Sequence, residues 1–433
     1  MSREHTNVAK QTGPSLILHI GMPKTGSTAL QGFLAHNRER LPDQQILYPQ
    51  CGHPVRQHTA LVKSIVVPLF DWALFNKSID IFDPVVYIND VLKQCQEQQC
   101  QKVILSSEFF WASPAMQAGP VHHTPSTENF AHLTTFIRSC KDLFKDFSNC
   151  TIVVYLRRQD DWIDSFFNQQ VKDGFSIPSR QELLGETKNY LLYHKNLALW
   201  ADFFGKENII VRYVDELPQR DVITDFVNLV GLDNNLLAQP EKNHRTANTK
   251  LSRKSASLMQ KAVALQFDPA MLALLREVLQ NLSFQTSSTG KTRGYTLFDS
   301  AFYKEVLELY DDDNSKLAAE YIDLTTPNVD RDASLTTKDG DDHNEVTQVD
   351  DHFEAKFEEL LEEFFARFAA HNIAMNNGQT GQNQEAALRA AQNQLAAAQQ
   401  QLNDILTSKR WLLGNIVAAP YRKMKSLLSS SPF

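Results

Sequence analysis

The chain has 433 residues, of which 42% are hydrophobic and 22% are charged, a composition typical of a globular protein with room for a large α/β domain and extensions. Its formal net charge of −8 argues against a general nucleic-acid binder, although it leaves room for a local basic pocket. No apolar run reaches the length of a transmembrane helix. Residues 1–14 are polar, lack a signal-peptide core and are expected to form a disordered leader, so we expect a cytoplasmic protein.

The five cysteines support the same compartment, because they are odd in number and follow no metal-site spacing. They are expected to be reduced thiols: Cys51, Cys95, Cys100, Cys140 and Cys150. The sequence predicts no metal site.

The first element is a strand, a tight loop and a helix start within residues 15–31. Residues 16–20 are almost continuously apolar, as in a strand that is buried on both faces. Gly21 and Gly26 bracket the turn, and Lys24 places a cation inside it. Backbone N–H groups and the helix dipole at such a turn favour an anion, so this loop predicts a phosphate-binding site.

The position of the lysine distinguishes this loop from a Walker A loop, GxxxxGK[ST]. Gly21 and Gly26 have the required spacing, but Ser27 stands where the Walker lysine would be. The basic residue lies inside the loop instead. The residues expected to hold the anion are Pro23, Lys24, Thr25, Gly26, Ser27 and Thr28.

Further apolar runs predict strands at residues 46–48, 103–106, 151–156 and 208–214. Residues 51–100, 131–144, 187–204 and 222–325 are predicted to be largely helical, and Gly205 is expected to end the third of these segments. Strands that alternate with helices indicate an α/β fold with a mostly parallel sheet flanked by helices, and ligands of such sheets bind at the carboxyl ends of the strands.

Two further polar residues follow predicted strands. Glu108 comes just after residues 103–106, and Arg157 follows residues 151–156 directly. Ser165 comes eight positions after Arg157, in the first turns of the next predicted helix. A guanidinium fork and a hydroxyl at this spacing are suited to bind one phosphate together.

The loop with its displaced lysine resembles the 5′-phosphosulfate loop of PAPS-dependent sulfotransferases, and Arg157 with Ser165 resembles their 3′-phosphate motif. Over residues 15–320 the chain is most similar to bacterial sulfotransferases of glycan modification. The resemblance implies a P-loop-like fold and transfer of a sulfuryl group from 3′-phosphoadenosine-5′-phosphosulfate (PAPS) to a carbohydrate hydroxyl.

That chemistry requires a stabiliser of the leaving group, for which Lys24 is suited. It also benefits from a general base, and two candidates remain open: Glu108 first and His58 second. The alternative roles are a helix-cap carboxylate for Glu108 and a surface histidine for His58.

The C-terminal part is predicted as an acidic linker at 326–352, a helix at 353–372, a polar linker with a short coiled-coil-like helix at 375–407 and a basic amphipathic tail at 408–433. Such a tail is suited to the anionic surface of the inner membrane or to a partner helix.

Two other functions compete with sulfuryl transfer. One is a P-loop kinase, disfavoured by Ser27 at the Walker lysine position. The other is a non-catalytic nucleotide-binding scaffold. The sequence predicts neither the acceptor nor the oligomeric state.

Overall fold

The structure is a computed structural model that describes residues 13–52, 56–70, 81–112, 128–175, 180–238, 250–251, 253–264, 272–273, 275–276, 279–280, 298 and 300–322. The chain divides into two compact units. Unit 1 comprises Met1–Trp162, Pro178–Lys242 and Ala301–Arg331, and unit 2 comprises Ile163–Ile177, Asn243–Ser300 and Asp332–Phe433. The segments predicted at 326–352, 353–372, 375–407 and 408–433, like the leader at 1–12, lie outside the described residues, and the predicted domain boundaries stay predictions.

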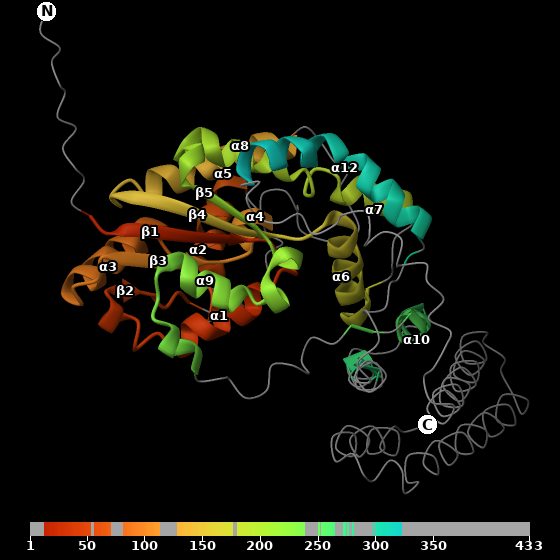
Figure 1. Ribbon diagram of the computed structural model, residues 1–433, viewed down its shortest axis with the longest axis horizontal. Helices are drawn as coiled ribbons and strands as arrows, with labels where there is room; N and C mark the ends of the chain where they lie inside the picture. The colour runs from red at the N-terminus through yellow and green to blue at the C-terminus, as the bar shows by residue number, and fades with distance from the viewer. Residues whose placement is uncertain are drawn as a thin grey trace, which may run out of the picture. The chain divides into compact units, whose positions relative to one another are not determined.

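Unit 1 is built on a five-stranded sheet in the order β2-β3-β1-β4-β5 (Figure 1). The strands are β1 (Ser15–Gly21), β2 (Ile46–Leu47), β3 (Lys102–Ser106), β4 (Asn149–Leu156) and β5 (Ile209–Tyr213). Each neighbouring pair in this sheet is parallel. The predicted α/β fold with a parallel sheet is therefore confirmed, and the strands lie where the apolar runs placed them.

The α-helices that flank and follow the strands are α1 (Ser27–His36), α2 (Thr59–Phe70), α3 (Pro84–Glu97), α4 (Phe109–Ala112), α5 (Glu128–Leu143), α6 (Gln159–Lys172), α7 (Arg180–Thr187), α8 (Tyr193–Phe204), α9 (Val222–Val230), α10 (Arg253–Ala264) and α12 (Ser300–Tyr321). Short 3-10 helices lie at Pro42–Gln44, Lys206–Asn208, Val214–Glu216, Pro218–Arg220 and Asn234–Ala238.

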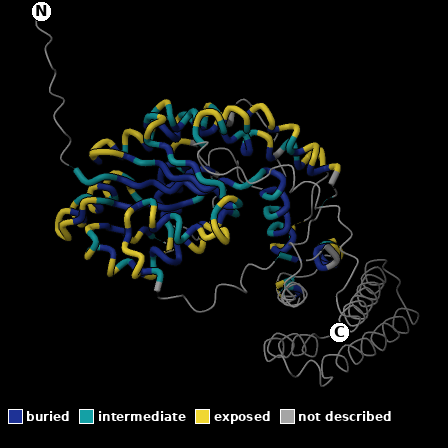
Figure 2. Tube along the Cα trace, viewed as in Figure 1, coloured by how far each residue is buried: buried dark blue, intermediate teal, exposed yellow. Residues whose placement is uncertain are grey.

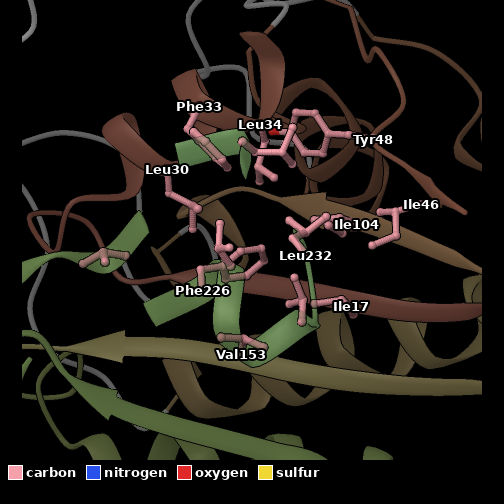
Figure 3. Close-up of a cluster of buried hydrophobic side chains, with 14 of the residues drawn as sticks. Ile17, Leu30, Phe33, Leu34, Ile46, Tyr48, Ile104, Val153, Phe226 and Leu232 are labelled. Atoms are coloured by element: carbon pink, nitrogen blue, oxygen red, sulfur yellow. The ribbon is translucent and has the colours of Figure 1, made fainter. Parts of the chain in front are cut away.

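One face of the sheet packs against α1 and α9, and α5 and α8 lie on the opposite side (Figure 1). Because side chains alternate along a strand, Ile17 of β1 and Val153 of β4 point to the first face, where they meet Leu30 of α1 and Phe226 of α9 (Figure 3). The three central strands β3, β1 and β4 are largely buried (Figure 2). This burial on both faces explains their continuous apolar sequences.

The helix predicted at 187–204 begins later, since α8 starts at Tyr193 and a break at residues 188–192 separates it from α7, which ends at Thr187. Leu192 precedes α8 and provides no side-chain cap. The cap comes instead from Asp313 of α12, whose carboxylate accepts hydrogen bonds from the backbone N–H groups of His194 (2.8 Å) and Lys195 (3.2 Å). A cap that comes from so far along the chain has no local sequence signal, which is why the break was missed. Gly205 follows α8, as predicted.

All five cysteines are free thiols, and each is buried. In the described part of the chain, no helix combines the length and the apolar character that crossing a bilayer requires.

Candidate functional site

The carboxyl edge of the sheet brings three predicted site segments together. β1 lies between β3 and β4, so the chain crosses from one side of β1 to the other between these two strands. The register pairs His19 of β1 with Ser106 of β3, and Gly21 with Val154 of β4. The loop after β1, Glu108 after β3 and Arg157 after β4 therefore follow three adjacent strands, at the switch point where ligands bind in such sheets.

The loop after β1 uses conformations that favour glycine. Gly21 has a φ of 112° and Gly26 a φ of 91°, both in the region that other residues rarely adopt. Lys24, between them, also has a positive φ of 69°. The spacing of the two glycines in the sequence thus reflects the backbone of a sharp turn.

Contacts from the loop itself and from the neighbouring strand end hold this turn in place. The Thr25 hydroxyl donates a hydrogen bond of 2.6 Å to the carbonyl of Met22, and the backbone N–H of Met22 donates to the carbonyl of Tyr155 in β4 (3.0 Å). The indole N–H of Trp162 donates to the carbonyl of Pro23 (2.8 Å). The loop is therefore fixed before any ligand binds, and the hydroxyl of Thr25 is used inside it.

The N-terminus of α1 is open. Gly26 is the N-cap, and no side chain caps the first turn. Gly26 and Thr28 are exposed, whereas Ser27 is buried. The N–H groups at the start of an α-helix lack intrahelical partners and carry the positive end of the helix dipole. With Lys24 in the preceding loop, this helix end is suited to bind an anion.

Glu108 lies directly against the start of the loop. A β-carbon on Gly21 would come within 2.9 Å of the Cα atom of Glu108, so the backbone of residue 108 abuts the end of β1. The Glu108 carboxylate accepts a hydrogen bond of 2.8 Å from the side-chain amide of Gln31 in α1. The structure thus places the first candidate base beside the predicted anion site.

His58, the second candidate base, is a buried structural residue rather than the surface histidine considered as its alternative. Its Nδ1 accepts a hydrogen bond from the backbone N–H of Ser106 (3.1 Å), and its Nε2 lies 3.0 Å from the carbonyl of Pro49. Burial lowers its pKa to about 4. Both ring nitrogens are therefore engaged by backbone groups, which leaves neither for an acceptor hydroxyl.

Arg157 lies at the end of β4 and is largely buried, with 14% of its side chain exposed. Its Nε lies 3.9 Å from a carboxylate oxygen of Asp215 and has no hydrogen-bond partner among the described residues. The Tyr193 hydroxyl donates to the backbone carbonyl of Arg157 (2.8 Å). The side chain thus keeps hydrogen-bonding capacity at the sheet edge, beside one acidic neighbour that sequence reasoning missed.

Ser165 lies on α6 and is half-buried, but it belongs to unit 2, whereas Arg157 belongs to unit 1. The convergence of these two residues on one phosphate therefore stays a prediction. Within unit 2, Asp164 pairs with Lys250 at 2.7 Å, and the Asn168 side chain binds the backbone N–H and carbonyl of Leu251, both at 2.9 Å.

An aromatic cluster near the site was also missed by the sequence analysis. The rings of Trp111 and Trp162 both pack against Tyr190, at centroid distances of 6.4 and 4.9 Å, and Trp111 also contacts Tyr193. Burial, with a contribution from the nearby Glu108 carboxylate, raises the pKa of Tyr190. These residues come from three separate segments, since Tyr190 and Tyr193 are close in the sequence, and only the fold brings the segments together.

His19 is a second buried histidine that had no sequence signal. Its Nδ1 lies 2.7 Å from the Ser106 hydroxyl, and burial lowers its pKa to about 4. Among the described residues, no group of three or more His, Cys, Asp or Glu side chains is placed to share a metal ion.

No protein-family model matches the chain. Over 173 residues it is 31% identical to an uncharacterized protein of Archaeoglobus fulgidus, a match that covers 39% of this chain and 45% of that protein, less than half of its length. Among solved structures it is similar to a sulfotransferase from Alicyclobacillus acidocaldarius, with a TM-score of 0.33 and 15% identity over 62% of this chain and 96% of that one.

Proposed function

We propose that the chain is a sulfotransferase that moves a sulfuryl group from PAPS to a hydroxyl of a carbohydrate acceptor. The observation that carries the proposal is the uncapped N-terminus of α1, with Lys24 in the preceding loop. Glu108 packs against Gly21, where that loop begins. This arrangement places anion-binding donors and a carboxylate at the same edge of one sheet. The donor class and the carbohydrate acceptor come from the family resemblance of the two sequence motifs.

In this mechanism the 5′-phosphosulfate binds the backbone N–H groups of Thr25, Gly26, Ser27 and Thr28, with Pro23 and Lys24 in the same loop. The Glu108 carboxylate takes the proton of the acceptor hydroxyl as its oxygen attacks sulfur. The bond between sulfur and the bridging phosphate oxygen breaks, and the 5′-phosphate of the leaving nucleotide gains negative charge. Lys24 and the loop N–H groups stabilise that charge because they are already in place. No metal is required.

Arg157 and Ser165 are proposed to hold the 3′-phosphate of the donor. Support for Arg157 comes from its place at the end of β4 and from its Nε, which has no hydrogen-bond partner in the described part of the chain. Glu108 is the proposed base. His58 is not proposed for this role, because both of its ring nitrogens contact backbone groups.

Calorimetry tests the nucleotide and separates the competing functions. The chain is titrated with 3′-phosphoadenosine-5′-phosphate (PAP) and, separately, with ATP and Mg²⁺. We expect binding of PAP that is weakened in Arg157→Ala, whereas a preference for ATP with Mg²⁺ would support a kinase.

Transfer itself is measured with radiolabelled PAPS and a panel of glycans and cell-envelope extract. We expect a labelled carbohydrate product, and a fall of about 100-fold in kcat for Glu108→Gln, because general base catalysis contributes about that much. PAP binding without any transfer would favour a nucleotide-binding scaffold, and full turnover of Glu108→Gln would contradict the assignment of the base.

A cytoplasmic enzyme held at the inner membrane by residues 408–433 would have lipid-linked glycans among its acceptors. This part of the proposal rests on the basic amphipathic sequence of that segment. Sedimentation with anionic liposomes, with and without residues 408–433, tests it. Equal sedimentation of both forms would exclude the segment as a membrane anchor and would favour a partner helix.

A further inference from the structure

We infer that Gln31 is the positioning residue of the proposed base: its amide fixes the Glu108 carboxylate at the anion site. This inference rests on the proposed function and extends it to a residue that neither sequence motif contains. The observation behind it is the hydrogen bond of 2.8 Å from Gln31 Nε2 to Glu108 Oε2.

The chemistry of the pair fixes the orientation of the amide. An ionised carboxylate only accepts hydrogen bonds, so the Gln31 side chain must present its nitrogen to Glu108. Among the described residues, this is the one hydrogen bond that the Glu108 carboxylate makes, and it occupies Oε2. Its other oxygen, Oε1, keeps all of its acceptor capacity for an acceptor hydroxyl.

Gln31 also connects the carboxylate to the anion site itself. It lies one turn after Ser27 in α1, and residues four apart lie on the same side of a helix. Both side chains are buried, with 3% of Gln31 and 4% of Ser27 exposed. The helix whose N-terminus is proposed to bind the donor therefore also holds the base, which fixes the distance between the two reacting groups.

Stability alone does not explain this pair. A buried amide costs free energy unless it is paired, and buried polar pairs can often be replaced by apolar residues without loss of stability. The Tyr190 hydroxyl, which lies near Glu108, is buried and has no hydrogen-bond partner in the described part of the chain. The polar groups are thus gathered around one carboxylate, as expected where its position matters for chemistry.

A double-mutant cycle tests the inference in the full chain. Gln31→Met keeps the length of the side chain and removes the amide. We expect kcat to fall about 10- to 100-fold, as for a misplaced catalytic group, while the KM for PAPS changes by less than about threefold. In a Glu108→Gln background the same substitution is expected to cause no further loss of kcat, because Gln31 acts through Glu108.

The matched control is Asn37→Leu, which removes another buried amide from the C-terminal end of the same helix, where Asn37 Nδ2 donates to the Phe33 carbonyl at 3.0 Å. We expect Asn37→Leu to lower thermal stability and to leave kcat unchanged. An equal loss of kcat in both variants, or an additive loss with Glu108→Gln, would overturn the inference. So would native kcat in Gln31→Met.

A spectroscopic measurement keeps the test independent of turnover. The infrared difference spectrum between the native chain and Glu108→Gln isolates the carboxylate stretch of Glu108, and we expect that band to shift in Gln31→Met. An unshifted band would overturn the inference by itself. A chain that transfers no sulfuryl group but shows the shifted band would overturn the proposed function and leave the Gln31–Glu108 contact standing. If Gln31→Met does not fold, Gln31→Leu, which also removes the amide and adds no carboxylate, replaces it with the same expected outcomes.

Discussion

The chain turns from strand to helix at two adjacent places on the sheet edge, after β1 and after β4, and the two helix starts differ in charge. The N-terminus of α1 has glycine as its cap and no capping side chain. The first turn of α6 contains Asp160 and Asp161, and the Asp160 carboxylate accepts the backbone N–H of Asp161 at 2.8 Å. The start of α1 therefore has no acidic side chain of its own, whereas the start of α6 already has the carboxylates of Asp160 and Asp161.

Because of this difference, the two turns would bind an anion through different groups. After β1, no described side chain caps the backbone N–H groups at the start of α1, and Lys24 lies in the preceding loop. After β4, the positive end of the α6 dipole already has the carboxylates of Asp160 and Asp161 beside it. Arg158 binds the Asp160 carboxylate through two nitrogens, at 2.6 and 2.8 Å. The anion proposed to bind there, the 3′-phosphate, would therefore depend on the side chains of Arg157 and Ser165 rather than on the helix end. Similar connections in one sheet thus end in helix starts of different charge, and the two proposed anion sites would bind their ligands through different groups.

The largest effect is expected from a substitution in the loop after β1. Lys24→Ala should lower kcat by about 100- to 1000-fold, because it removes a preorganised charge from the position where the leaving group becomes negative. Steady-state transfer from PAPS measures this. Lys93→Ala, which removes an exposed lysine of α3, is the control and should leave kcat unchanged. If Lys24→Ala keeps native kcat, the loop is not the site of chemistry.

The next prediction compares the two neighbouring arginines of the second turn. Arg157→Ala should weaken PAP binding about 10- to 100-fold, since it removes a charged donor from the 3′-phosphate. Arg158→Ala should leave PAP affinity nearly unchanged but lower the free energy of unfolding by about 1–3 kcal/mol, because it removes the two guanidinium hydrogen bonds from the buried Asp160. Calorimetry and urea unfolding measure the two effects. Equal losses of affinity in both variants would contradict the separation of roles.

A third test concerns His58, whose ring contacts Ser106 at the end of β3 and is kept neutral by burial. Its pKa is about 4 in the folded chain, against about 6.5 when unfolded, so the unfolded state binds more protons between these values. Stability should therefore fall as the pH drops from 6.5 towards 4, with a contribution from His58 of about 2 kcal/mol between pH 7 and pH 5. Urea unfolding at both pH values, in the native chain and in His58→Gln, measures it. A pH dependence that is the same in both would show that His58 is not held neutral by burial.

The smallest expected effect is on the loop backbone. Gly26→Ala should lower the free energy of unfolding by about 1–2 kcal/mol and weaken PAP binding, because its φ of 91° disfavours a β-carbon that would also come within 3.2 Å of Val222. Gly185→Ala in α7 is the matched control. There the β-carbon meets no atom within 4 Å, and we expect stabilisation of about 0.5–1 kcal/mol. Thermal and urea unfolding compare the two, and a stabilised Gly26→Ala would show that the turn does not need glycine.

The amino-acid sequence by itself determined the strands, the parallel α/β fold and the loop between Gly21 and Ser27, because these follow from local patterns. A strand that is buried on both faces must be apolar throughout, and a turn with positive φ values favours glycine. The positions of Glu108 and Arg157 at strand ends could be predicted from the sequence for the same reason. The local pattern also indicated which edge of the sheet they share.

Only the tertiary structure decided which side chains meet at that edge. The order β2-β3-β1-β4-β5 brings Gln31 to Glu108 and Asp215 to Arg157, pairs that lie 77 and 58 positions apart in the sequence. It also buries His58 among backbone groups, so that a residue suited to base catalysis by its type becomes structural by its surroundings. Such contacts depend on the packing of separate elements, and no local pattern encodes them.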